Sequence, residues 1–135
     1  MAGYSKRSLA AKLGIKPNVT IYLVNPPEHY EETLGPLPDG VKWVEEPEAA
    51  NGFIQFFTKS QRELKAEFPR LKAALAADGM LWVSWPKKAA KVETDLDGNI
   101  VREVGLTNGL VDVKVCAVDE TWSGLKFVYR LKDRE

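Results

Sequence analysis

The chain has 135 residues, of which 44% are hydrophobic and 28% charged, and nineteen basic side chains balance nineteen acidic ones. This composition is ordinary for a globular protein, and a chain of this length is expected to fold as one domain over residues 1–135 with a full core. The neutral total argues against a dedicated surface for nucleic acid or for an anionic membrane, so we expect neither as a partner.

Cysteine and histidine are too scarce for several kinds of site. Cys116 is the only cysteine and His29 the only histidine, which excludes an intrachain disulfide and a Cys/His metal cluster. No apolar run approaches the ~18 residues that a membrane-spanning helix needs, and the N-terminal segment is too weakly apolar for a signal peptide. We therefore expect a cytoplasmic protein with no metal site.

The first half of the chain alternates short helices with strands. Residues 5–17 place two leucines four apart before a glycine, which predicts a short helix, and the β-branched run 19–24 predicts a strand covered on both faces. Residues 28–35 then predict two helical turns, residues 41–47 a short strand with an acidic end, and residues 53–57 another buried strand. Such alternation is typical of parallel strands joined by helices.

The second half opens with a strong helix signal. Ser60 followed by Glu63 forms a capping box, and the apolar residues after it recur at helical spacing. Pro69 lies inside this pattern and predicts a kink or two consecutive helices. Gly79 is expected to end the helix, and residues 80–85 then predict a buried strand.

The chain finishes with a helix and a strand pair. Residues 95–109 carry apolar residues on one helical face before an Asn-Gly stop. Residues 111–118 and 125–131 predict two strands, and the short connection "DETWSG" requires them to be antiparallel neighbours. The complete order predicts a three-layer α/β domain of about six strands, mostly parallel, with helices on both faces and a C-terminal antiparallel hairpin.

This order resembles a reduced class I methyltransferase fold. The stretch "LGIKPNVTIYLVN" is similar to the segment that introduces the first strand of those enzymes, and "LAADGMLWVSWP" is similar to their helix–glycine–strand passage two-thirds along. The resemblance covers most of the chain and implies a Rossmann-like, methyltransferase-like topology. Because many proteins with this fold do not methylate anything, it implies architecture more than activity.

Two further stretches carry a more specific resemblance. "LVDVKVCAVDETWSGLKFV" and "LWVSWPKKA" make the chain resemble the bacterial DUF3052 family, a domain of unknown function. That resemblance implies a small Rossmann-like protein of the bacterial cytoplasm, and it brings no established activity and no mapped site.

The turn after the first strand decides our expectation about cofactors. A dinucleotide or S-adenosylmethionine (SAM) site uses a glycine-rich turn there, and an acid about 20 residues further on holds the ribose hydroxyls. Glu45 stands twenty positions after Asn25, so the acid is present. Pro26 and Pro27 occupy the place of the glycines, with rigid rings and without two N–H donors. We therefore expect no cofactor, and the turn argues against SAM in particular.

Ligands of open α/β sheets bind outside the carboxyl ends of the strands. That rule defines a candidate ligand-binding rim, which consists of Asn25, Glu28, His29, Glu45, Thr58, Trp85, Lys87 and Lys88. His29 beside Glu28 is a candidate general base, and the two lysines are candidate contacts for an anion. For each of these charged groups the alternative is an ordinary solvated side chain.

The two tryptophans of residues 80–85 are three positions apart, so a regular strand points them to opposite faces of the sheet. Trp82 is then a core residue. Trp85 is the one that can line a pocket at the rim, with packing in the core as the alternative.

Our leading hypothesis is a non-catalytic Rossmann-like binding or regulatory module for a small anionic ligand or a protein partner, because no motif ties a nucleophile to a base. We expect no catalytic residue. One alternative is a divergent SAM-dependent methyltransferase that uses the same rim. Another is an interaction scaffold that acts through Trp122 in the hairpin loop, where packing of the ring back onto the sheet is the other outcome.

Overall fold

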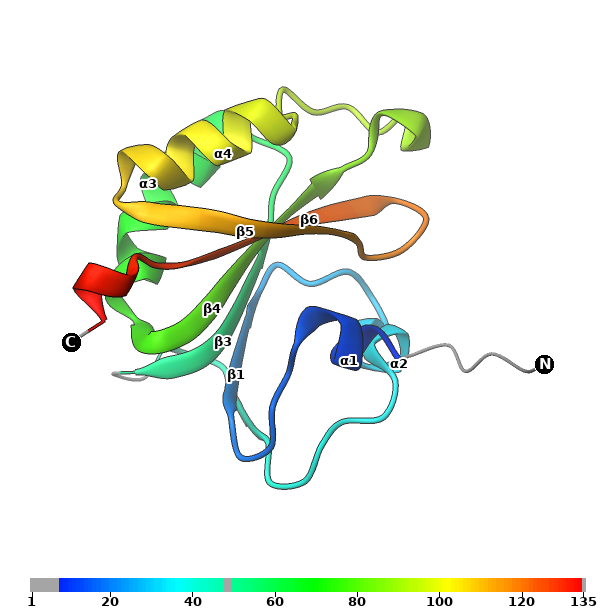
Figure 1. Ribbon diagram of the computed structural model, residues 1–135. Helices are drawn as coiled ribbons and strands as arrows, with labels where there is room; N and C mark the ends of the chain where they lie inside the picture. Colours follow the sequence, from blue (N-terminus) through cyan, green and yellow to red (C-terminus); the bar gives the residue numbers. More distant parts are fainter. Residues whose placement is uncertain (1–7, 48–49, 135) are drawn as a thin grey trace.

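The computed structural model describes residues 8–47 and 50–134 of the chain. Its six strands form one sheet in the order β2-β1-β3-β4-β6-β5 (Figure 1). The strands are β1 (Thr20–Val24), β2 (Lys42–Val44), β3 (Asn51–Phe57), β4 (Leu75–Pro86), β5 (Leu110–Ala117) and β6 (Trp122–Tyr129). β1 to β4 pair in parallel, whereas β6 is antiparallel to both β4 and β5. The predicted mostly parallel sheet with a C-terminal antiparallel pair is confirmed.

Helices cover both faces of this sheet. They are α1 (Leu9–Leu13), α2 (Tyr30–Leu34), α3 (Gln61–Ala73) and α4 (Gly98–Thr107), with two short 3-10 turns, η1 (Lys88–Ala90) and η2 (Leu131–Asp133). Figure 1 shows α1 and α2 together on one side of the sheet and α3 and α4 on the other. Among the described helices, none is long and apolar enough to cross a membrane. The three-layer prediction is confirmed.

The sheet separates two apolar cores, because successive side chains of a strand point to opposite faces. In β3, Phe53 and Phe57 belong to the core under α1 and α2, whereas Ile54 and Phe56 belong to the core under α3 and α4. The tryptophans of β4 divide in the same way: Trp82 lies in the first core and Trp85 in the second. Their predicted opposite orientation is confirmed.

The first helix ends at the glycine that its sequence predicts, and the structure places its start at Ser8. Ser8 accepts a hydrogen bond from the Ala11 N–H at 3.1 Å through its side-chain Oγ. At the other end Gly14 adopts φ 86°, a left-handed conformation that glycine takes without strain, and its N–H donates to the last helical carbonyls. Residues 5–7 of the predicted segment lie outside the described residues.

The passage from α3 to β4 corrects two expectations. α3 runs through Pro69 as one continuous helix, so the predicted division into two helices is wrong, whereas the predicted kink stays a prediction. Pro69 and Lys65, whose carbonyl loses its usual donor, both lie on the exposed side. Gly79 does not end this helix, which finishes at Ala73, and instead lies inside β4. A Cβ at Gly79 would stand 2.9 Å from the carbonyl oxygen of Asn51. The glycine is therefore needed because two strands approach closely, and not because a helix stops.

Candidate functional site

The order of the strands reverses direction at β1. The chain leaves β1 to form β2 on one side of it and then returns to form β3 on its other side. In an open α/β sheet, such a switch point forms a crevice outside the carboxyl ends of the strands, and ligands bind there. The residues that follow β1, β2 and β3 therefore form the candidate ligand-binding region.

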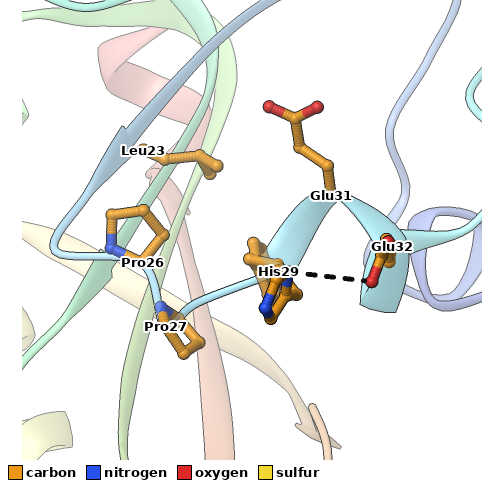
Figure 2. A pocket seen from close by; sticks show the side chains of 7 residues that line it. Leu23, Pro26, Pro27, His29, Glu31 and Glu32 are labelled. Carbon is orange, nitrogen blue, oxygen red and sulfur yellow. Dashed lines mark ion pairs between the residues drawn. The ribbon is translucent and has the colours of Figure 1, made fainter.

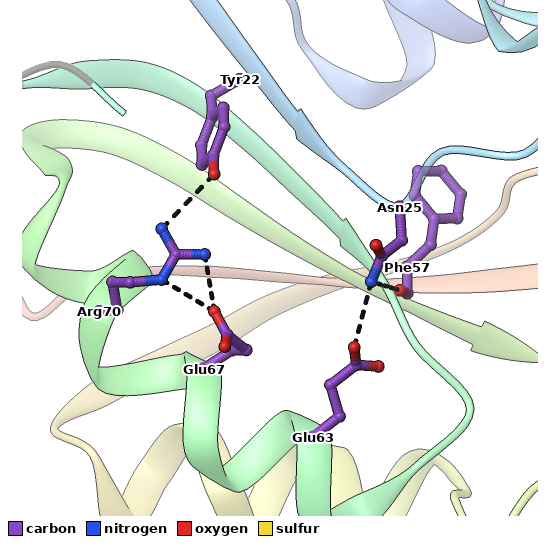
Figure 3. Close-up of polar contacts among 6 residues, drawn as sticks. All are labelled: Tyr22, Asn25, Phe57, Glu63, Glu67 and Arg70. Carbon is purple, nitrogen blue, oxygen red and sulfur yellow. Dashed lines mark hydrogen bonds and ion pairs between the residues drawn. The ribbon is translucent and has the colours of Figure 1, made fainter. Parts of the chain in front are cut away.

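Asn25 is the first residue after β1, and it ties the end of that strand to its neighbour (Figure 3). Its Nδ2 donates to the carbonyl oxygen of Phe57 at 3.2 Å and to Glu63 Oε2 at 3.3 Å. Thr58, directly after β3, donates to the other oxygen of the same carboxylate at 2.5 Å. The structure thus brings Asn25 and Thr58, two residues of the predicted rim, together through Glu63.

Glu63 is a site residue that the sequence analysis assigned only to a helix cap. Half of the predicted capping box is present, since Ser60 Oγ accepts from the Glu63 N–H at 3.1 Å. The carboxylate of Glu63, however, turns to Asn25 and Thr58 and not back to the N–H of Ser60, which donates to Thr58 Oγ1 at 3.2 Å. The spacing located this glutamate correctly, but the partner of its carboxylate depends on β1, which is distant in sequence.

The backbone of Asn25 has φ 58°, in the left-handed region. Among residues other than glycine, asparagine is one of the few that enter this region readily. Asn25 therefore makes the sharp turn after the first strand that the sequence analysis considered to need a glycine. His29, at the start of α2, also has a positive φ of 61° and makes no side-chain cap to the helix.

A pocket of about 380 Å³ opens beside this turn (Figure 2). Its walls combine apolar and acidic side chains and consist of Leu23, Pro26, Pro27, His29, Tyr30, Glu31 and Glu32. His29 Nδ1 lies 3.9 Å from Glu32 Oε1, and both side chains are largely exposed. A volume of this size and a mixed lining are typical of a small-molecule site.

A buried polar chain supports the floor of this pocket. Tyr30 donates to Gln55 Oε1 at 2.6 Å, and Gln55 Nε2 donates to Ser84 Oγ at 3.1 Å. Burial raises the pKa of Tyr30, so its hydroxyl stays protonated and acts as a donor. These hydrogen bonds were not predicted from the sequence, although a glutamine and a serine within apolar strands are a signal that could have indicated them. Their effect is to fix α2 on β3 and β4.

A second pocket, of about 420 Å³, lies at the carboxyl end of β4. Trp85, Lys87 and Lys88 line it together with Leu96 and Asp97. Trp85 is only 8% exposed, so it is at once a core residue and a pocket wall. Four residues of the predicted rim are therefore divided between two pockets: His29 lines one on the face of α1 and α2, and Trp85, Lys87 and Lys88 line one on the face of α3 and α4.

Glu28 and Glu45 of the predicted rim, and the predicted partner-binding residue Trp122, line neither of these two pockets. Glu28 and Glu45 are exposed. Val44 pairs with Tyr22 in the sheet, so Glu45, the next residue, is level with Leu23 of the first pocket. Trp122 is half-buried, with its ring edge-on to Phe57 at a centroid distance of 5.2 Å. A role of Trp122 in partner binding stays a prediction.

Comparisons with known proteins show the fold. A scan against family models and a search of curated proteins give no match, so the DUF3052 resemblance stays a prediction. Among solved structures, the chain is similar to magnesium protoporphyrin IX methyltransferase from Synechocystis with bound SAH (9% identity, 90% of this chain and 78% of that chain, TM-score 0.58). It is also similar to a SAM-dependent methyltransferase from Aquifex aeolicus (13% identity, 87% of this chain and 85% of that chain, TM-score 0.57). A third similar structure is DhpI in complex with SAH (10% identity, 91% of this chain and 83% of that chain, TM-score 0.61). The chain has the methyltransferase-like α/β fold.

These neighbours correct the expectation about cofactors. We expected no cofactor and considered SAM disfavoured, but solved proteins of this fold hold SAH, and the Synechocystis enzyme is also matched with SAM bound. The expectation rested on the rigid rings and missing N–H donors of Pro26 and Pro27, and it did not consider that Asn25, just before them, turns the chain in a left-handed conformation.

Proposed function

We propose that this chain binds SAM at the carboxyl ends of β1 and β2 and acts as a small, divergent methyltransferase. The observation that carries this proposal is the reversal of strand order at β1, combined with the left-handed turn at Asn25 directly after that strand. A sharp turn at a switch point lets the chain leave the sheet so that a ligand can approach the strand ends.

Two features of the chain suit the adenosine part of such a ligand. Glu45 offers an exposed carboxylate at the end of β2, and a carboxylate can accept hydrogen bonds from both ribose hydroxyls. The pocket beside β1 offers apolar walls from Leu23, Pro26 and Pro27. Because the two prolines lack N–H donors, we expect Glu45 and apolar contact to supply more of the affinity than the backbone of the turn.

The charge of the pocket suits a cationic cofactor. SAM supplies a methyl group on a positively charged sulfur, and Glu31 and Glu32 place two carboxylates in the pocket wall. His29, with its Nδ1 near Glu32, is the group available to accept a proton from a methyl acceptor that must lose one. Its exposed position leaves the ring accessible to an incoming substrate.

The test is calorimetric titration of the full chain with SAM and with SAH, using a matched pair of variants. Glu45→Gln removes the proposed ribose contact and should weaken binding by about tenfold or more, the loss expected for hydrogen bonds to a charged group. Glu46→Gln removes the neighbouring exposed carboxylate and should change affinity by less than about twofold. Absence of SAM and SAH binding by the folded wild type would refute the proposal, and equal losses in both variants would refute the role of Glu45.

A further inference from the structure

A basic hollow lies at the opposite end of the sheet, against the first half of β4 and against β5 and β6. A cavity of about 260 Å³ there is lined by the cations Lys16, Lys126 and Arg134 and by one carboxylate, Asp78. Three positive charges and one negative charge leave an excess of two positive charges in the lining. Within the described part of the chain, none of these three cations takes part in an ion pair.

Lys126 is held in a place that disfavours a cation. In the antiparallel pair of β5 and β6 it lies directly opposite Lys114, and in the pair of β4 and β6 it lies opposite Trp82. Like charges opposite each other on neighbouring strands destabilise a sheet. Lys114 has its own acceptor, the carbonyl oxygen of Lys12 at 3.1 Å. Lys126 thus lies in the sheet between Lys114 on β5 and Trp82 on β4.

The protonation of Lys126 reflects these surroundings. Partial burial lowers its pKa, and the charges of Lys114 and Lys16 lower it further. An anion bound in the hollow would raise the pKa of Lys126, whereas both neighbouring lysines lower it. The cavity therefore combines enough space for a small ligand, an excess of positive charge and a partly desolvated lysine.

We propose that this hollow binds the phosphate group of a small phosphorylated molecule. A phosphate group carries about −1.5 to −2 charge at neutral pH and several acceptor oxygens, which matches an excess of two positive charges. Arg134 adds a planar donor group of the kind that contacts phosphate oxygens in pairs, although its Nε already donates to the carbonyl oxygen of Tyr129 at 2.9 Å.

A neighbouring hollow provides space for the rest of the molecule. This neighbouring cavity, of about 240 Å³, shares Lys16, Asp78 and Met80 with the basic hollow, and its other walls include Ile15 and Phe53. Two adjoining concave spaces, one basic and one with both polar and apolar walls, suit a compact organic phosphate better than an extended polyanion, which needs a long basic surface. The ligand class is therefore a small phosphomonoester or diphosphate ester.

This site is distinct from the proposed SAM site. It lies against the first half of β4 and against β5 and β6, whereas Asn25 and Glu45 follow the carboxyl ends of β1 and β2. A phosphorylated ligand bound here is therefore an accessory ligand and not the acceptor of a methyl group. Binding at the basic hollow can be measured without SAM, and binding of SAM can be measured without phosphate. Failure of one proposal therefore leaves the other intact.

The test uses the full chain, with pyrophosphate and inorganic phosphate as probes, at constant ionic strength against chloride. We expect saturable shifts of the amide NMR signals of Gly79, Met80 and Lys126, and a rise in Tm with pyrophosphate. Lys126→Met keeps the aliphatic stem but removes the charge, and should weaken binding by about tenfold or more. Lys65→Gln, on the exposed side of α3, should leave affinity within about twofold of wild type.

Lys126→Met also provides an internal check on folding. Because it removes the repulsion with Lys114, its Tm without phosphate should equal or exceed that of wild type, so lost binding cannot be attributed to unfolding. Amide shifts spread over lysines at both ends of the strands, and not confined to the basic hollow, would overturn the proposal. Equal binding by wild type and Lys126→Met would overturn it too. Absence of any saturable shift with either probe would overturn it as well.

Discussion

Trp82 of β4 donates a hydrogen bond from its indole Nε1 to the carbonyl oxygen of Leu13, 69 positions earlier in the chain, at 3.0 Å. Leu13 is the last residue of α1, and its carbonyl is one of those that a helix leaves without a partner at its end. Trp82 is fully buried. A side chain in the middle of the sheet therefore holds the end of the first helix in place.

Replacing this indole should cost stability. Trp82→Phe leaves the carbonyl oxygen of Leu13 without its donor and opens space in the core, so we expect the free energy of unfolding to fall by about 2–3 kcal/mol. Urea unfolding followed by circular dichroism measures the loss. Trp43→Phe, on an exposed residue of β2, is the matched control and should change it by less than about 0.5 kcal/mol. Similar losses in both variants would contradict the importance of the contact with Leu13.

Two glycines of α4 should respond to alanine in opposite directions. A Cβ at Gly105 would overlap the ring of Phe127 on β6, so Gly105→Ala should destabilise the protein by about 1–3 kcal/mol. A Cβ at Gly98 would stand 3.5 Å from the ring of Trp85, an ordinary contact, so Gly98→Ala should stabilise it by about 0.5 kcal/mol through helix propensity. Thermal unfolding of the two variants tests the pair, and destabilisation by both would show that α4 lies closer to Trp85 than we describe.

Tyr30 should make stability depend on alkaline pH. Burial raises its pKa above the ordinary value of 10.0, so the unfolded chain loses this proton at lower pH than the folded chain does. The stabilisation is complete below the unfolded pKa and is lost as pH rises, with a slope of up to about 1.4 kcal/mol per pH unit. Urea unfolding of wild type and Tyr30→Phe at pH 9 and 10.5 isolates the effect, because other groups titrate in both. A constant difference between the two proteins would contradict it.

The turn after β1 should discriminate between residues by their backbone preference. Asn25→Gly and Asn25→Val both lose the hydrogen bonds to Phe57 and Glu63, but only glycine adopts φ 58° without strain. We expect Asn25→Val to be less stable than Asn25→Gly by about 1–2 kcal/mol in chemical unfolding. We also expect Asn25→Gly to retain more SAM affinity. Equal stability of the two variants would show that the left-handed turn is not required.

The order of elements could be predicted because it depends on local signals. Ser8 and Gly14 bound α1, and the alternation of β3 side chains between the two cores follows from strand geometry alone. Gly79 shows where this fails. A glycine after a helix pattern predicts a helix end, but Gly79 is needed because β3 passes too close for a Cβ. The residues next to Gly79 in the sequence do not indicate that β3 lies there.

The candidate site was predictable as a set of positions and not as an arrangement. The strand-end rule selected Asn25 and Thr58, which the structure joins, but their common partner Glu63 had been assigned to a cap. The same rule placed His29 and Trp85 on one rim, whereas the sheet lies between their pockets. Which face of the sheet a loop follows depends on helix packing, and residue spacing within a loop does not report it.

The short β2 strand has a consequence for how ligand binding can be observed. β2 is three residues long and, among the described strands, pairs with β1 alone. Backbone amides of such a strand exchange with solvent through small local openings, whereas those of the central strand β4 require a much larger unfolding event. Because Glu45 directly follows β2, a ligand held by its carboxylate would restrain those openings. Slowed hydrogen exchange over Lys42–Val44 would then report occupancy of the site, even with a ligand that has no methyl group to give.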